Sequence, residues 1–226
     1  AAYGVGAATA TLAALVASRL PDLQAHAVSG APVAATNAPT LSSTLRDHRS
    51  VFVTLGVAVL LVSAVRASRQ VVIPLWADHL ALEAAVASVI YGLAGGVDML
   101  LFYPAGLVMD RKGRHWVAVP SMLIMGVALL LMPLTHGAVT LLLAALALGL
   151  GNGISAGLIM TIGADQSPPV GRAHFLGVWR LMSDIGASCG PALLSLLTAA
   201  FTLGTGIAII GVLALAGAAQ FARWMP

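Results

Sequence analysis

The sequence predicts an all-α, polytopic transmembrane helix bundle. Of its 226 residues, 59% are hydrophobic and only 8% are charged, whereas a typical soluble domain has roughly 25% charged residues. Six apolar stretches are each long enough to cross the hydrocarbon layer, which takes roughly 20 helical residues. These stretches are expected to be helices, because a helix satisfies its own backbone hydrogen bonds in lipid.

The six whole spans are separated by short polar connections. In chain order they are expected at residues 51–77, 84–109, 116–134, 138–162, 175–201 and 204–222. Residues 1–18 are also apolar, and we interpret them as a truncated N-terminal span. Residues 19–50 are rich in Pro, Ser, Ala and Asn without apolar periodicity, which predicts a flexible linker. Residues 51–226 are expected to form one six-helix transmembrane domain.

Composition argues against several other classes of protein. The net charge is +3, but the Lys and Arg residues form no basic face with interleaved aromatic residues, so nucleic-acid binding is not expected. Cys189 is the single cysteine and permits no intrachain disulfide. The six histidines are scattered, with no pair at helical ligand spacing, so neither a metal site nor a cofactor is predicted.

The positive charges predict the orientation of the bundle. If the spans alternate in direction, all basic residues outside the spans fall on one side: Arg19, Arg46, Arg49, Arg111, Lys112, Arg114, Arg172 and Arg223. The opposite connections contain no Lys or Arg. This asymmetry places the linker and the C-terminus in the cytoplasm. We therefore expect a multi-pass integral protein of the plasma (inner) membrane.

A short charged turn follows the second whole span. Gly106, Asp110, Arg111, Gly113 and Arg114 are spaced as in the G-x-x-x-D-R-x-G-R signature, and the segment resembles that of the major facilitator superfamily. In that family the signature joins the second and third helices of a six-helix half, which is also its place here. A glycine would let helices approach at this turn, and the arginines could bridge to the carboxylate or to lipid phosphate.

A second pattern lies in the fifth whole span. Gly177, Gly186, Gly190 and Pro191 are spaced similarly to the G-x8-G-x3-G-P signature of the proton-coupled antiporters in this superfamily. Close helix packing at Gly186 and Gly190 is the alternative explanation. The resemblances together imply the last helix of the N-terminal half, the central loop and the whole C-terminal half. The N-terminal half would then be a missing partner.

Ionisable residues inside the spans are candidates for a solute or proton pathway, because they are expensive in hydrocarbon. Arg66, Arg69 and Gln70 share one face of the first whole span. Asp98 lies in the second span, with Tyr91 seven residues earlier. Counting from the shared outer loop places Arg66 and Asp98 at similar depth, so they could pair and leave Arg69 for an anionic solute. A purely structural ion pair is the alternative.

Two further polar residues complete the predicted pathway. Asp184 lies four residues after Arg180 in the fifth span, and a carboxylate at that depth can take up and release a proton. Arg180 could instead extend to the membrane surface. Asn152 belongs to a stretch in which Gly149, Gly153 and Gly157 form a smooth ridge for helix packing. Asn152 either faces a cavity or bonds to a neighbouring helix.

The resemblance implies a secondary active transporter that moves a small solute by alternating access. Its partners would be that solute, membrane lipids and a proton as coupling ion. Proton-coupled export of drugs or metabolites is favoured by the antiporter-like pattern, whereas uptake of a small organic anion is favoured by the arginines. A membrane scaffold or receptor component without transport is the alternative from another class. No enzyme is expected: the G-x-S-x-G match at Gly153–Gly157 lacks a preceding strand and catalytic partners.

Overall fold

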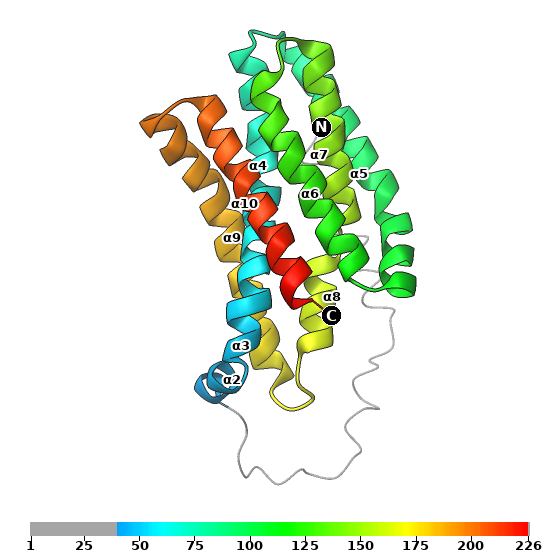
Figure 1. Cartoon of the computed structure of the whole chain (residues 1–226), viewed down its shortest axis with the longest axis vertical. Helices are drawn as coiled ribbons and strands as arrows, with labels where there is room; N and C mark the ends of the chain where they lie inside the picture. Colours follow the sequence, from blue (N-terminus) through cyan, green and yellow to red (C-terminus); the bar gives the residue numbers. More distant parts are fainter. Residues whose placement is uncertain (1–39, 226) are drawn as a thin grey trace, which may run out of the picture. The chain divides into compact units, whose positions relative to one another are not determined.

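The computed structural model describes residues 40–225 (Figure 1). Two short helices, α2 (Leu41–Asp47) and α3 (Arg49–Val51), lead through a π-helical turn, η2 (Phe52–Gly56), into the bundle. The remaining elements are α4 (Val57–His79), α5 (Ala84–Lys112), α6 (His115–Leu131), η3 (Met132–Leu134), α7 (Ala138–Ile154), α8 (Leu158–Gln166), α9 (Arg172–Ala200) and α10 (Leu203–Trp224). In this part of the chain six helical segments are long and apolar enough to cross a membrane.

The all-α fold with six whole spans is therefore confirmed, and the boundaries agree to within a few residues. Two details differ from the sequence prediction. The expected span 138–162 is broken after Ile154 and resumes at Leu158. The last part of the predicted linker is helical rather than flexible, because Thr40 caps α2 and His48 packs edge-on against Phe175 of α9, with ring centroids 5.5 Å apart. The predicted truncated span 1–18 lies outside the described residues.

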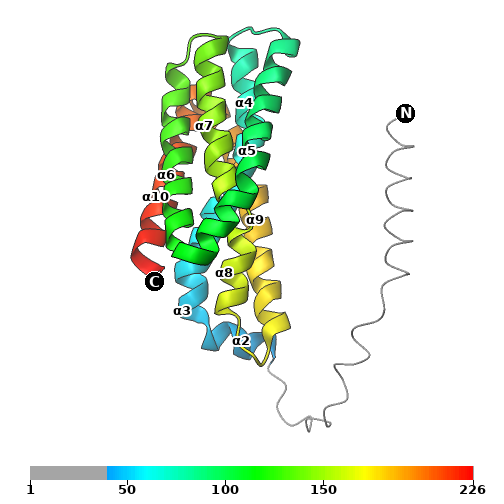
Figure 2. The same cartoon turned by 90° about the vertical axis from the view of Figure 1, so that its right-hand side faces the viewer.

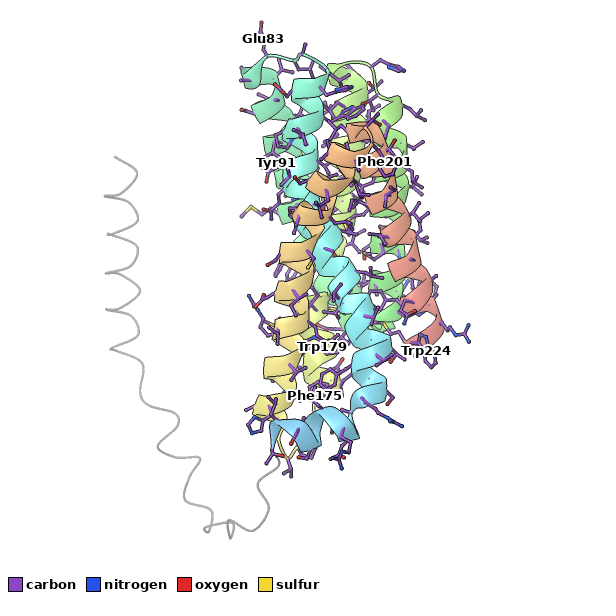
Figure 3. All side chains as sticks on the ribbon, turned by 90° about the vertical axis from the view of Figure 1, so that its left-hand side faces the viewer. Glu83, Tyr91, Phe175, Trp179, Phe201 and Trp224 are labelled. Carbon is purple, nitrogen blue, oxygen red and sulfur yellow. The ribbon has the colours of Figure 1, made fainter. Side chains whose placement is uncertain are left out.

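The helices pack in both parallel and antiparallel pairs: α4 runs parallel to α9 and α5 to α7, whereas α6 is antiparallel to α7 and α10 (Figure 2). α4 lies along α9 and also contacts α10, α5 packs on α7, and α6 packs on both α7 and α10. The connections alternate between the two ends of the bundle. The end with the α4–α5 connection is called the Glu83 end, and the opposite end, with the α5–α6 turn, is called the Asp110 end; Figure 3 shows Glu83 at the top of the bundle.

Glycines set the closest helix contacts. A Cβ at Gly186 or Gly190 of α9 would collide with the backbone carbonyl of Leu60 or Ala64 in α4. The packing explanation for these two members of the antiporter-like pattern is thus supported. Gly177, the first member, has no neighbouring atom within 4 Å of such a Cβ.

The predicted glycine ridge on α7 is confirmed at two of its three positions. Gly149 and Gly153 press against the backbone of α5 at Ala94 and Asp98. Gly157 has a different role: its left-handed φ of 77° belongs to the break between α7 and α8, where glycine is favoured because it has no Cβ. Gly106, expected to allow close approach at the charged turn, has open space around it among the described residues.

Two helices form the least covered face of the bundle. Only 11% of the most apolar stretch of α5 and 17% of that of α9 is buried, against 44% to 50% in the other four spans. The side chains left exposed on α5 are large and apolar, including Met99, Leu100 and Tyr103. In a membrane protein such a face meets either lipid or another protein.

A matched pair of substitutions tests the α4–α9 contact. Gly190→Ala is expected to destabilise the bundle by about 1–3 kcal/mol, because the added methyl group overpacks against the Ala64 carbonyl. Gly177→Ala, in the same helix but in open space, should be neutral or stabilising by up to about 1 kcal/mol. Thermal unfolding of the detergent-solubilised protein measures both. Equal stability of the two variants would contradict this packing.

Candidate solute-binding cavity

A cavity of about 700 Å³ opens between α4, α9 and the broken span formed by α7 and α8. Its walls are mostly apolar, with polar side chains converging from α4, α7 and α9. The polar lining residues are Ser63, Arg66, Gln70, Asn152, Arg180, Ser183 and Asp184. A largely apolar pocket with a few placed polar groups is typical of a small-molecule site.

The break between α7 and α8 forms one side of this cavity. A helix end inside a membrane leaves backbone carbonyl groups that need partners from the protein. The carbonyl of Ser155 accepts a hydrogen bond of 2.9 Å from Arg66 Nη1. The carbonyl of Ile159, just beyond the break, accepts one of 2.7 Å from Trp179 Nε1. Arg66 of α4 therefore satisfies the carbonyl at the end of α7, and Trp179 of α9 holds the first turn of α8, whose carbonyl groups also bond within that helix.

Trp179 can lie this close to α8 because Gly163 leaves room for its indole ring. A Cβ at Gly163 would approach Trp179 Cδ1 to 2.6 Å. Trp179 also continues a stack of aromatic rings through Phe175 to Phe52, with centroid distances of 5.9 and 4.9 Å. Figure 3 shows Phe175 and Trp179 in the lower part of the bundle. The cavity wall is thus tied to the Asp110 end of the protein.

Asp98 forms a polar cluster that joins three helices. Its Oδ2 accepts hydrogen bonds from Arg69 Nη2 of α4 at 3.1 Å and from Asn152 Nδ2 of α7 at 2.6 Å. The backbone contact of Gly153 with α5 brings Asn152 within reach. Asn152 therefore meets both sequence-based expectations, since it lines the cavity and also bonds to a neighbouring helix.

The partner of Asp98 differs from the prediction. The ion pair forms with Arg69, and Arg66 instead contacts the helix break. Depth counted along the helix axis did not account for the direction of the side chains. A long helical side chain leans toward the N-terminus of its own helix, so Arg69 reaches back to the level of Asp98. Arg69 is also the more buried arginine, and its Nε and Nη1 have no hydrogen-bond partner among the described residues.

Asp184 and Arg180 lie one turn apart on α9 and form an ion pair in the cavity wall. Arg180 Nε donates to Asp184 Oδ1 and Oδ2 at 2.9 and 3.1 Å, and both side chains are about half exposed. Close by, Ser183 Oγ lies 2.9 Å from Ser63 Oγ of α4. Arg180 is therefore occupied in an ion pair rather than directed only to the surface.

The remaining predicted pathway residues differ in position. Gln70 lines the cavity, one turn beyond Arg66 on α4. Tyr91 does not line it, and it lies on an exposed part of α5 (Figure 3). The sequence analysis did not single out Trp179, although its placement one residue before Arg180 in a polar stretch of the fifth span could have indicated a role there.

The charged turn connects two parts of the bundle at the Asp110 end. Gly113 has a left-handed φ of 95° and lets the chain turn directly from α5 into α6. Arg114 then bonds to Asp165 at the end of α8, with Nε 2.8 Å from Oδ2, while Asp110 lies farther away, at 4.0 Å. The expected bridge from an arginine to Asp110 is thus the weaker of the two contacts. The turn holds the end of α8, whose other end borders the cavity.

Six apolar spans, three of which border a cavity with a few polar groups, define a polytopic integral membrane protein with the architecture of a transporter domain. Residues 55–226 match the family profile described as Major Facilitator Superfamily. Because this match covers most of the chain, the protein belongs to that superfamily and is a membrane transporter. A search of curated proteins gave no match.

The Asp98 cluster can be tested by removing its charges separately and together. Asp98→Asn is expected to lower the free energy of unfolding by about 3 kcal/mol, because Arg69 is left buried without a counter-charge. The double variant Asp98→Asn/Arg69→Gln should recover much of this loss. Thermal unfolding in detergent gives the coupling between the two residues. Purely additive effects would mean that the ion pair does not stabilise the bundle.

Proposed function

We propose that the protein is a secondary active transporter in which the cavity between α4, α8 and α9 binds a small solute during alternating access. The observation that carries this proposal is the broken span beside the cavity. In transporters, interrupted helices form binding sites, and their irregular backbone is tolerated where it is buried in protein or lines a cavity. The Arg66 and Trp179 contacts to this break link the cavity to the position of α8.

The proposed coupling ion is a proton that is exchanged at Asp184. This carboxylate lines the cavity and is about half exposed, so water and solute can reach it. Protonation would release Arg180 and change the charge of the cavity wall. Asp98 is the less accessible carboxylate, since both of its hydrogen bonds lead to neighbouring helices. The direction favoured by the antiporter-like pattern is export of a drug or metabolite.

A second candidate function is uptake of a small organic anion. The specific observation in its favour is Arg66, which lines the cavity and contacts a backbone carbonyl instead of a carboxylate. The two candidates differ in the direction of transport and share the same cavity. A scaffold without transport would not need this concentration of polar side chains inside the spans.

The proposed partner of this domain is a second six-helix unit that covers α5 and α9. These are the two spans with little buried surface, and α9 supplies part of the cavity wall. A second unit placed there would close the cavity on its open side. We infer that transport needs this second half, whether from the same polypeptide or from another copy. The proposed orientation places the Asp110 end in the cytoplasm of a cell with the protein in its plasma (inner) membrane.

Orientation and alternating access can be tested with single cysteines in a Cys189→Ser background. Ala81→Cys should react with a membrane-impermeant maleimide from outside, and Lys112→Cys only after the cells are permeabilised. Ala187→Cys, in the cavity wall, should react from both sides at rates that depend on the state of the protein. Reaction of positions 81 and 112 from the same side would refute the topology. Strictly one-sided reaction at position 187 would refute alternating access.

The role of Asp184 is tested by the pH dependence of the same labelling. With Asp184 intact, lowering the pH should change the ratio of outside to inside reaction at position 187, because proton exchange at Asp184 would release Arg180. Asp184→Asn should remove most of this pH dependence. Asp78→Asn, an exposed position at the Glu83 end, serves as the control and should keep it. An unchanged pH response in Asp184→Asn would exclude this residue as the coupling site.

A further inference from the structure

The charges around the cavity do not balance. Its ionisable lining residues are Arg66, Arg180 and Asp184. Arg180 and Asp184 neutralise each other in a direct ion pair. The contacts of Arg66 within the described residues are both to Ser155, one to the carbonyl oxygen at 2.9 Å and a longer one to Oγ at 3.5 Å. The cavity therefore carries one positive charge without an opposing carboxylate, which is costly within a membrane.

The Ser155 carbonyl is a weak substitute for a carboxylate. It lies at the C-terminal end of α7, where the helix dipole contributes only about half a negative charge. A carboxylate would offer a full charge and two acceptor oxygens that match the planar guanidinium group. The first residues of α8, including Ile159 and Met160, border the same space. The dipole at the N-terminal end of α8 favours an anion, as the positive charge of Arg66 does.

The rest of the cavity is suited to an apolar body. Met160, Leu176 and Trp179 line it together with small residues of α4, α8 and α9. Trp179 presents an indole ring whose N–H is already bonded to Ile159. The residue is only 1% exposed, so Trp179 supports the apolar lining from behind. A molecule that pairs a charged group with an aromatic or aliphatic part would use both regions.

We propose that the cavity binds an amphipathic monoanion, an apolar body bearing one carboxylate, and that this carboxylate takes Arg66 from the Ser155 carbonyl. The proposal rests on the proposed function, since this ligand would be the transported solute. Once Arg66 is withdrawn, the Ser155 carbonyl keeps the longer backbone bond from Leu158 N, at 3.2 Å, and the Trp179 contact still holds α8. Binding of the anion therefore loosens the junction of α7 and α8.

A charge series on one ring tests the ligand class. Benzoate, benzamide and benzylamine have similar size and carry a negative, a zero and a positive charge. Equilibrium binding of each radiolabelled probe is measured on the full chain in lipid nanodiscs. Benzoate should bind saturably, and the other two at least about tenfold more weakly, because a charge-assisted contact to an arginine is lost.

Substitutions assign the preference to Arg66. Arg66→Gln should weaken benzoate binding about tenfold or more and abolish discrimination within the series. Arg66→Lys keeps the charge and should retain the preference for benzoate, which guards against a variant that simply fails to fold. Arg223→Gln removes the same charge from an exposed position at the end of α10, outside the cavity, and should bind like the wild type.

Hydrogen exchange of backbone amides tests the displacement of Ser155. Benzoate should speed exchange in a peptide covering residues 155–161 of the wild type and of Arg223→Gln. Arg66→Gln should exchange rapidly there without benzoate and show no further change. Three results would each overturn the proposal. The first is benzamide or benzylamine binding as tightly as benzoate, and the second is the absence of saturable benzoate binding. The third is Arg66-dependent binding without faster exchange in this peptide.

The result is separable from that of the proposed function. A protein that binds benzoate through Arg66 and loosens the break, but whose cavity reacts strictly from one side of the membrane, would refute alternating access and leave the binding site intact. A cavity that reacts from both sides but binds benzylamine more tightly than benzoate would support alternating access and refute the anion site.

Discussion

The hydrogen bond from the Arg66 guanidinium to the Ser155 carbonyl satisfies a backbone acceptor at a helix break within the membrane. Hydrocarbon offers no hydrogen-bond partner, so an interrupted membrane helix is stable only where the protein satisfies the freed groups. Here Arg66 of α4 satisfies the Ser155 carbonyl, and Trp179 of α9 fixes the start of α8 beyond the break. Arg66 also lines the cavity, so the side chain that satisfies the break borders the same space. The broken span and the cavity thus share one polar side chain.

The side-chain contacts depend on close helix packing, which glycines allow. On α9, Gly186 and Gly190 bring the backbone against α4, and on α7, Gly153 brings it against α5 at Asp98. This approach allows Asn152 to reach the carboxylate that also binds Arg69. The two arginines of α4 consequently have separate roles although they lie one turn apart. Arg69 is part of a cluster that joins three helices, and Arg66 remains directed to the cavity.

Burial divides the six spans into two groups. The central helices of the bundle are about half buried, whereas α5 and α9 keep most of their surface exposed. One of these two helices carries the Arg180 and Asp184 ion pair into the cavity wall. At the Asp110 end, Arg114 ties the turn after α5 to the end of α8. Movement of α8 would therefore be transmitted to the charged turn that carries the family signature.

By itself the sequence determined the number, order and approximate limits of the spans, because hydrocarbon thickness and backbone satisfaction leave little choice for long apolar stretches. It also identified the superfamily through the spacing around Asp110, and it selected most of the polar residues that line the cavity. Only the tertiary structure decided that Arg69, and not Arg66, pairs with Asp98, that Gly157 ends a helix, and that Trp179 supports the break. These facts depend on how side chains of different helices are directed toward one another. Counting residues along each helix gives depth but not that direction.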